Sequence, residues 1–133
     1  MADSQGRPKV LVLVYSHLAS DARVLRQVRW LSRMYDVTSA SFGPSPVEGV
    51  SHIELDDLPP YRPGAFARLI YITRFLLRRF ESLTRANARD RAAAERLGAS
   101  RWDVIVANDV GALPLAFSLE SRYGVLADVH EYA

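Results

Sequence analysis

Polar and ionisable residues follow three apolar stretches of this sequence, at the point where each stretch ends. They come in pairs: Ser16 and His17, Asn108 and Asp109, and His130 and Glu131. Their hydroxyl, imidazole, amide and carboxylate groups can hold a ligand by hydrogen bonds, and the imidazole and carboxylate groups can also exchange protons. If the apolar stretches are parallel strands, their carboxyl ends meet at one sheet edge, where ligands bind in open α/β sheets. We therefore expect one ligand site built from three strand ends.

The loop after the first stretch has a structural and a functional interpretation. Ser20 or Asp21 is expected to cap the following helix, because short polar side chains satisfy the free N–H groups of a first helical turn. For Asp21 this role is commoner than binding a substrate. His17 lies at an open position, and the two interpretations are equally good for it.

The later strand ends leave similar alternatives open. Asn108 and Asp109 could bind a ligand or cap the helix that follows them. Asp128 lies inside an apolar stretch, so it could be a buried carboxylate that anchors backbone N–H groups or an arginine, or it could act in catalysis. For His130, the neighbouring carboxylates favour a functional role over a simple strand-end hydrogen bond.

The first strand is the element around which the others are organised. Residues 10–15 are an unbroken apolar run rich in β-branched side chains, which is typical of a parallel strand covered on both faces. Val24, Val28 and Leu31 then indicate a helix with one apolar side. Further strands are predicted at residues 35–42, 50–55, 102–107 and 125–129, and a short helix at 112–123 that ends at Gly124.

Residues 65–97 contain no proline or glycine and are rich in alanine, leucine and arginine. They predict one long helix, or two that abut with a break near residues 82–87, closed by Gly98 as a left-handed cap. One broad apolar arc is expected to pack on the sheet: Phe66, Leu69, Ile70, Ile72, Leu76, Leu77, Phe80 and Leu83. The opposite arc is rich in arginine and also carries two aromatic residues: Arg68, Tyr71, Arg74, Phe75, Arg78 and Arg79.

This succession of elements predicts a single α/β domain over residues 1–133. Right-handed crossovers between the strands imply a Rossmann-like, doubly wound and mostly parallel sheet in a three-layer α/β/α arrangement. The expected strand order is 3-2-1-4-5. In that order the first, fourth and fifth strands are neighbours, so their polar ends fall together.

Composition limits the classes of function. A formal charge of +2 is too small to argue for nucleic-acid binding. Without cysteine the chain has no disulfide or thiolate site, and three scattered histidines make a metal site improbable, so we expect none. No apolar run approaches the ~20 residues that a membrane span needs, and the polar leader is unlike a signal peptide, so the cytoplasm is the expected location.

Three motifs in order resemble the amino-terminal domain of GT-B glycosyltransferases of the family-4 type. The first is the helix start SDARVLRQVRWLSRMYDVT after the first strand, and the others lie in WDVIVANDVGALPLAFSLESRYGVLADVHEYA. They correspond to a Ser/His-Asp-x-Arg-Val helix start, an Asp-Val-(apolar)₃-x-(His/Asn)-Asp strand end and an Asp-x-His-Glu strand end. The resemblance covers almost the whole chain and is weakest in residues 45–101.

The resemblance implies the acceptor-side half of an enzyme that transfers a sugar from a UDP- or GDP-linked donor with retention of configuration and without tightly bound cofactor. A carboxyl-terminal domain would hold the donor nucleotide, and this chain carries no Glu-x₇-Glu motif of that domain. It implies that His130 lines the cleft near the transferred sugar, as the catalytic candidate. The implied residues facing donor phosphates or acceptor are Ser16, His17, Ser20, Asp21, Asn108, Asp109 and Glu131. Relatives often have two glycines in the first loop, and this loop has none.

Two further functions stay open from the residues alone. The Arg-rich helix could make the chain a stand-alone module that docks on a protein or on the inner face of a membrane to reach a lipid-linked acceptor. A dinucleotide- or flavin-binding protein is less well supported, because no G-x-G-x-x-G follows the first strand. An uncovered last strand would also allow a homodimer.

Overall fold

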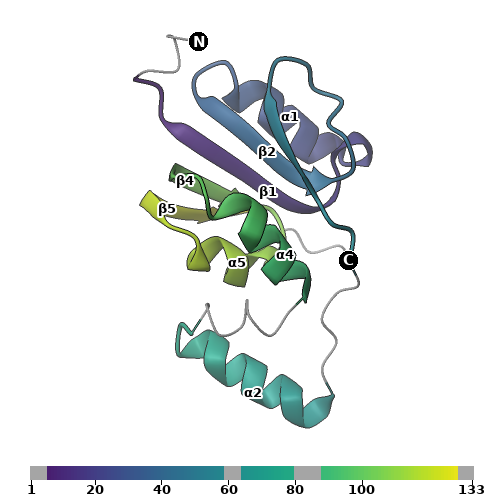
Figure 1. Cartoon of the computed structure of the whole chain (residues 1–133), viewed down its shortest axis with the longest axis vertical. Helices are drawn as coiled ribbons and strands as arrows, with labels where there is room; N and C mark the ends of the chain where they lie inside the picture. The colour runs from purple at the N-terminus through teal and green to yellow at the C-terminus, as the bar shows by residue number, and fades with distance from the viewer. Residues whose placement is uncertain (1–5, 59–63, 80–87, 129–133) are drawn as a thin grey trace.

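A computed structural model describes residues 6–58, 64–79 and 88–128 of the chain. A five-stranded sheet forms its centre, with the strands in the spatial order β3-β2-β1-β4-β5 (Figure 1). All four neighbouring pairs are parallel. The strands are β1 (Lys9–His17), β2 (Asp36–Phe42), β3 (Ser51–Leu55), β4 (Trp102–Ala107) and β5 (Ser121–Ala127). The predicted Rossmann-like α/β fold and the strand order 3-2-1-4-5 are confirmed.

Helices cover both faces of this sheet. One face packs on α1 (Ala22–Leu31), and the other packs on α4 (Ala88–Leu97) and α5 (Leu113–Ser118) (Figure 1). Short 3-10 turns, η2 (Leu18–Ser20) and η3 (Val110–Ala112), lie at the ends of β1 and β4. The remaining described helix, α2 (Ala65–Leu76), lies outside the α4–α5 layer and farthest from the sheet.

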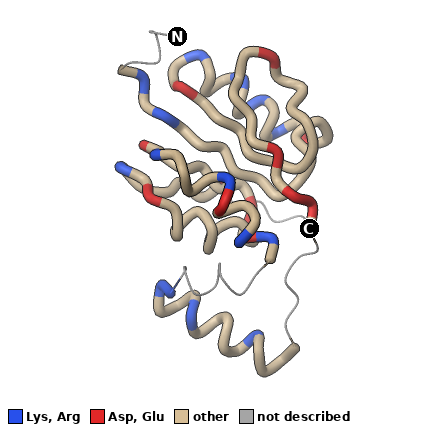
Figure 2. The backbone as a smooth tube through the Cα atoms, in the orientation of Figure 1, with Lys and Arg blue, Asp and Glu red and all other residues tan. Residues whose placement is uncertain are grey.

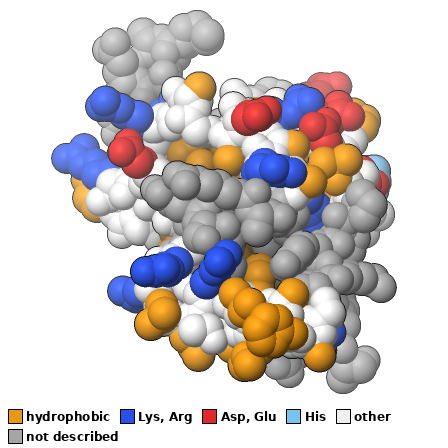
Figure 3. Space-filling view, turned by 60° about the horizontal axis from the view of Figure 1, so that its bottom comes forward, with side chains coloured by type: hydrophobic (Ala, Val, Ile, Leu, Met, Phe, Trp, Pro, Cys, Tyr) orange, Lys and Arg blue, Asp and Glu red, His pale blue; other side chains and the backbone are white. Residues whose placement is uncertain are grey.

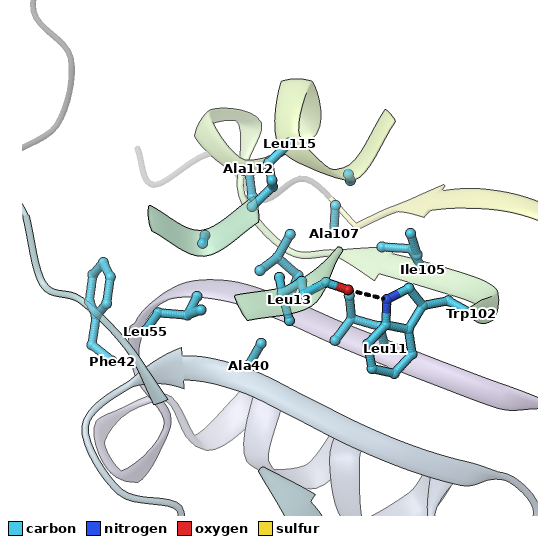
Figure 4. Close-up of a cluster of buried hydrophobic side chains, with 13 residues drawn as sticks. Leu11, Leu13, Ala40, Phe42, Leu55, Trp102, Ile105, Ala107, Ala112 and Leu115 are labelled. Carbon is cyan, nitrogen blue, oxygen red and sulfur yellow. Dashed lines mark hydrogen bonds between the residues drawn. The ribbon is translucent and has the colours of Figure 1, made fainter. Parts of the chain in front are cut away.

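The side chains of β1 alternate between two hydrophobic clusters. Leu11 and Leu13 join the cluster under α4 and α5, while Val10, Val12 and Val14 join the cluster under α1. All five are buried. In the first cluster Trp102 lies under the end of α4 and donates its indole N–H to the Leu97 carbonyl oxygen at 3.3 Å (Figure 4). Because successive side chains of β1 enter the two clusters in turn, apolar residues are needed at every position of the strand and not only at every second one.

The boundary between α5 and β5 differs from the prediction. The helix ends at Ser118 and the strand already begins at Ser121, so residues 119–123 are not helical. Gly124 lies inside β5 with a φ of 114°, where one extra residue of β5 lies between its pairs with Trp102 and Val104. This is a bulge, and glycine takes its left-handed backbone without strain. Residue 129, the predicted end of the strand, lies outside the described residues.

Gly98 is not a left-handed cap. Its φ is not positive, as a left-handed cap would require, and its amide donates to the Ala94 carbonyl oxygen at 2.8 Å. A Cβ at this position would lie 2.8 Å from the same oxygen. Glycine at position 98 therefore avoids the clash that a Cβ would make with the Ala94 carbonyl oxygen.

The predicted helix at 65–97 is two helices in the described residues. The first ends at Leu76, and Arg78 then takes a left-handed backbone with a φ of 60°. Residues 80–87, which include the predicted core members Phe80 and Leu83, lie outside the described residues. Within this part of the chain the sequence offers no glycine or proline to mark the end of α2.

The apolar arc of α2 does not pack on the sheet, which corrects the prediction. No residue of α2 is buried, and Phe66, Leu69 and Leu76 are 76%, 61% and 75% exposed. Tyr71 and Phe75, expected toward solvent, are half-buried instead. The physical reason is that α4 and α5 already cover this face through Ala93, Leu97, Leu115 and Ala116, so they occupy the place on the cluster that α2 was expected to take.

Candidate functional site

The carboxyl ends of β1, β4 and β5 lie side by side, and we call this edge the carboxyl rim (residues 15–21, 108, 109 and 128). The amide of Asn108 donates to the Leu13 carbonyl oxygen at 3.0 Å, and the amide of Asp128 donates to the Ala107 carbonyl oxygen at 2.8 Å. Asp109 bridges to β1, because its Oδ2 accepts the amide N–H of Tyr15 at 2.7 Å. The rim therefore brings together the described strand-end residues that the sequence placed there. His130 and Glu131 lie outside the described residues.

Asn108 and Asp128 belong to one hydrogen-bonded network with α1. Arg23 pairs with Asp128 at 2.8 Å and reaches the Asn108 side-chain oxygen at 3.4 Å. Gln27 accepts from the Asn108 amide group at 2.9 Å and donates to Asp128 at 3.4 Å. Asn108 is only 2% exposed. Both residues thus brace the ends of β4 and β5 against α1. Asp128 anchors an arginine, as one alternative predicted, but it follows the end of β5 and its side chain is 36% exposed, so the expectation of a buried carboxylate inside the strand is wrong.

Asp109 has a similar bracing role. It stands just before η3, yet its side chain makes no capping hydrogen bond there. Instead it joins β4 to β1 through the Tyr15 amide. A carboxylate that accepts a backbone N–H across two strands fixes their separation at the rim.

Residues 16–21, which comprise the last two residues of β1 and the connection to α1, are the more open part of the rim, and we call them the serine loop. Asp21 caps α1 by accepting the Val24 amide at 3.2 Å, and it also accepts the Ser16 hydroxyl at 3.4 Å. The Ser20 hydroxyl donates to the His17 carbonyl oxygen at 3.0 Å. Ser20 is exposed and Ser16 is half-buried. The capping role expected for Asp21 is confirmed, and the hydroxyl groups stay within reach of a ligand.

His17 has the most accessible ionisable side chain of this loop. Its imidazole is 56% exposed and lies 3.5 Å from the Asp57 carboxylate. It stands edge-on to Phe42 at the end of β2, with ring centroids 6.0 Å apart, and over Gly43, where a Cβ would lie 2.9 Å from its Nδ1. The ring can therefore exchange hydrogen bonds with a polar ligand at the rim.

Sequence reasoning missed a buried cluster behind this edge. The Tyr15 hydroxyl donates to Asp90 of α4, and the Arg89 guanidinium stacks 4.0 Å from the centre of the Tyr15 ring. Asp90 is fully buried, and its Oδ2 has no hydrogen-bond partner in the described part of the chain. Burial raises the pKa of Asp90, against the opposing effects of the Tyr15 hydrogen bond and the Arg89 charge. The only sequence signal was an acid near the start of an arginine-rich helix.

Tyr15 stays protonated in this setting. Burial is the main cause that raises its pKa, and the nearby charge and hydrogen bond of Asp90 act in the same direction. The hydroxyl therefore acts as a donor to Asp90. This contact ties the end of β1 to α4, as Asp109 ties it to β4.

A shallow pocket of about 650 Å³ lies at the opposite edge of the sheet, at the amino ends of β4 and β5. Lys9, Trp102, Asp103 and Arg122 are among its lining residues. The Asp103 carboxylate accepts the Lys9 amide at 2.7 Å, so it braces strands as well. We do not place the site there, because ligands of open α/β sheets bind at the carboxyl ends of strands.

The rim can bind a polar, hydroxyl-rich group. It offers two serine hydroxyls and an imidazole from one loop, backed by carboxylates and amides that hold the strands in place. No group of three or more His, Asp or Glu side chains that could hold a metal occurs in residues 6–58, 64–79 and 88–128. No protein-family model matches the chain, and no curated protein and no solved structure matches it.

Proposed function

We propose that the chain is the acceptor-binding domain of a GT-B, family-4 type glycosyltransferase, which moves a sugar from a UDP- or GDP-linked donor to an acceptor with retention. The observation that carries the proposal is the carboxyl rim itself. Hydrogen bonds join the ends of β1, β4 and β5 there, while Ser16, His17 and Ser20 stay accessible. The Rossmann-like sheet in the order 3-2-1-4-5 supports it. So do the three motifs that resemble this family.

In this proposal the rim residues have distinct roles. Ser16, His17 and Ser20 bind hydroxyl groups of a sugar or lipid-linked acceptor. Asp21, Asn108 and Asp109 position that loop and the strand ends, because their side chains are already engaged with the protein. His130 is the proposed catalytic residue and Glu131 a further substrate ligand, on the strength of the resemblance.

A second domain would complete the proposed enzyme. Charge on the departing nucleotide phosphate must be stabilised during transfer, and that contribution would come from a carboxyl-terminal domain. We therefore expect no sugar transfer by this chain alone. Binding of an acceptor does not need the second domain and can be tested on the chain as it is.

The test is a titration of the isotopically labelled chain with saccharides, nucleotide-sugars and NAD, followed by amide chemical shifts. We expect saccharides to shift the amides of residues 16–21 and 109. Ser20→Ala should weaken this binding by roughly 5- to 10-fold, the loss of a net hydrogen bond of about 1 kcal/mol. Ser32→Ala is the matched control, because the Ser32 hydroxyl, on a half-buried residue, also donates to the carbonyl three residues earlier, at the far end of α1.

Two outcomes would contradict the proposal. Tight binding of NAD with no response to saccharides would indicate a dinucleotide protein. Equal loss of affinity in Ser20→Ala and Ser32→Ala would show that the serine loop is not the binding surface.

A second function has its own observation in its favour, namely that no residue of α2 is buried. We infer that α2 is a docking surface, which would make the chain an interaction module, with a peripheral membrane location as one form of it. In the described residues no helix is long and apolar enough to cross a membrane. A homodimer through the outer edge of β5 is a related proposal, because edge strands present unpaired backbone groups. Light scattering that finds only monomers would refute it.

A further inference from the structure

The exposed side of α2 is an apolar arc that the described residues of the chain leave uncovered. At ~100° per residue these side chains fall within less than half of the helix circumference. We define the α2 arc by its exposed large members: Phe66, Leu69, Ile70, Ile72 and Leu76, with Leu77 just beyond the helix. They are 39–76% exposed. Figure 3 shows these apolar side chains gathered over α2 at one end of the molecule.

Basic residues stand on both sides of the α2 arc. On the helical wheel Arg68 borders one side and Arg74 the other, while Arg78 and Arg79 follow the helix. Residues 64–79 contain these four arginines and no Asp or Glu. Figure 2 accordingly shows only basic charge along this segment. The surface that meets the α2 arc must therefore tolerate apolar contact and carry negative charge.

The opposite side of α2 is less exposed than the α2 arc. Ala67, Tyr71 and Phe75 recur at helical spacing and are half-buried, so this side faces the rest of the chain. The exposed α2 arc is therefore the outer side of a helix that lies at one end of the molecule (Figure 1). A flat partner can reach it without moving the sheet or α4.

Charge separates the candidate occupants of the α2 arc. A second copy docked arc to arc would bring two sets of arginines together with no acid on either helix to compensate them. An anionic bilayer supplies both requirements at once, because acyl chains accept the apolar arc and headgroups accept guanidinium groups beside it. We propose that α2 lies flat on an anionic lipid surface with the α2 arc inserted at the headgroup boundary. This inference rests on the docking function proposed for α2.

The dimensions of α2 fit a helix lying in the interface. Its 12 residues extend about 18 Å, well short of a bilayer core. Long arginine side chains can bury their methylene groups along the arc and keep their charge among the headgroups. The interaction should thus need both apolar insertion and negative lipid charge.

The test measures co-sedimentation of the whole chain with vesicles of phosphatidylcholine alone and with about a third of phosphatidylserine. We expect binding to the anionic vesicles and little to the neutral ones. Leu69→Ser combined with Leu76→Ser should weaken binding at least ~10-fold through lost apolar insertion. Arg68→Gln combined with Arg79→Gln should weaken it by on the order of tenfold at low salt. Arg91→Gln combined with Arg101→Gln is the charge-matched control on exposed positions elsewhere, and we expect it to bind more tightly than the α2 pair.

A label on the chain makes the orientation testable. The sequence has no cysteine, so Leu76→Cys gives one site for an environment-sensitive dye, and Ser32→Cys gives a second site as the control. We expect a blue shift on anionic vesicles for the label at position 76 and none for the label at 32. A shift at both positions, or at 32 alone, would overturn the proposed orientation.

Other outcomes separate this inference from the docking function on which it rests. Absence of vesicle binding, or equal binding by the two-leucine variant, would overturn the lipid proposal. If light scattering then showed a dimer that the same variant dissociates, α2 would still be a docking surface, with a second copy as its partner. If neither vesicles nor a partner copy responded to the variant, both proposals would fail.

Discussion

The contact between Tyr15 and Asp90 can be tested by Tyr15→Phe, which removes only the hydroxyl donor. In the native chain this donor serves one oxygen of a fully buried carboxylate, and the other oxygen has no partner in the described residues. The variant therefore leaves a buried acid without its hydrogen bond from β1. We expect Tyr15→Phe to destabilise the fold measurably while the packing of the ring on Phe42, with centroids 5.8 Å apart, is kept.

The expected magnitude follows from the charge of the acceptor. A hydrogen bond to a charged group contributes about 1.5–3 kcal/mol, against about 0.5–1.5 kcal/mol for a neutral pair. Burial raises the pKa of Asp90, so binding a proton costs the folded chain less than it would cost an exposed aspartate, and a protonated Asp90 would show only the smaller loss. For ionised Asp90 the loss on Tyr15→Phe should be about 1.5–3 kcal/mol at pH 7.

The dependence on pH gives the sign of the effect. Because burial raises the folded-state pKa of Asp90 above 3.8, its contribution to stability is fully present below pH 3.8. That contribution is lost as the pH rises through the folded pKa. The hydrogen bond from Tyr15 lowers the pKa of Asp90, so its removal raises that pKa further. Tyr15→Phe should therefore cost more stability at pH 7 than near pH 4.

Asp90→Asn is the matched control because it keeps an acceptor for Tyr15 and removes the buried charge. We expect this variant to be as stable as the native chain at pH 7, or more stable, and to lose the pH dependence contributed by Asp90. In this background Tyr15→Phe should cost only about 0.5–1.5 kcal/mol. The coupling energy of the double-mutant cycle should therefore be about 1 kcal/mol.

The assay is urea unfolding across pH 4–8, followed by the fluorescence of Trp102, which is buried. A loss of under 0.5 kcal/mol for Tyr15→Phe at pH 7 would contradict the reasoning. So would an equal cost of Tyr15→Phe in the native and Asp90→Asn backgrounds, because the hydrogen bond would then not depend on charge.

Three smaller perturbations test the rim by the same unfolding assay. Arg23→Met removes a half-exposed ion pair and should cost about 1 kcal/mol, less at high salt; no loss would mean that the network does not brace the strands. Asp21→Ala should cost about 1 kcal/mol and Asp21→Asn much less, since asparagine also caps; equal costs would count against capping. Gly43→Ala should cost about 1 kcal/mol more than Gly49→Ala, because both have a positive φ but only at position 43 does a Cβ meet His17; equal costs would refute the close approach.

The strand order and the central strand could be predicted because they depend on local composition and on connection rules. An apolar run without alternation at residues 10–15 needs cover on both faces, and the clusters around Leu11 and Val12 supply it. Right-handed crossovers then leave few orders for five parallel strands. The cap at Asp21 could be predicted for the same reason, since it satisfies N–H groups only three residues away.

The boundary of β5 could not be predicted from local pattern. Leu119, Tyr123 and Val125 fit a helix or a strand about equally well, and Gly124 has the usual meaning of a helix end. In the fold, pairing with β4 decides the matter, and the glycine is used inside the strand as a bulge. Tertiary pairing thus overrides a correct statistical expectation about glycine.

The buried cluster of Tyr15 and Asp90 had no sequence signal strong enough to predict it. The two residues are 75 positions apart, and each has an ordinary local explanation, as the end of an apolar strand and as an acid in the first turn of a helix. The predicted orientation of α2 was wrong for a related reason. Its apolar arc indicates a partner for Leu69 and Leu76, but periodicity cannot say whether the sheet still has room for them.

The rim side chains that are already paired within the protein limit which substrate the proposed enzyme could bind there. The guanidinium of Arg23 is paired with Asp128, and the amide and carboxylate of residues 108 and 109 are bonded to neighbouring elements. The groups left accessible are two hydroxyls and the His17 imidazole, in a loop that lacks the glycines needed for close approach of backbone amides to phosphate. A ligand with neutral hydroxyl groups, such as a sugar, suits this surface better than a charged pyrophosphate does. On the proposed function this edge should therefore respond to the acceptor sugar more than to the nucleotide of the donor, and a titration in which UDP shifts residues 16–21 more than any saccharide would reverse that assignment.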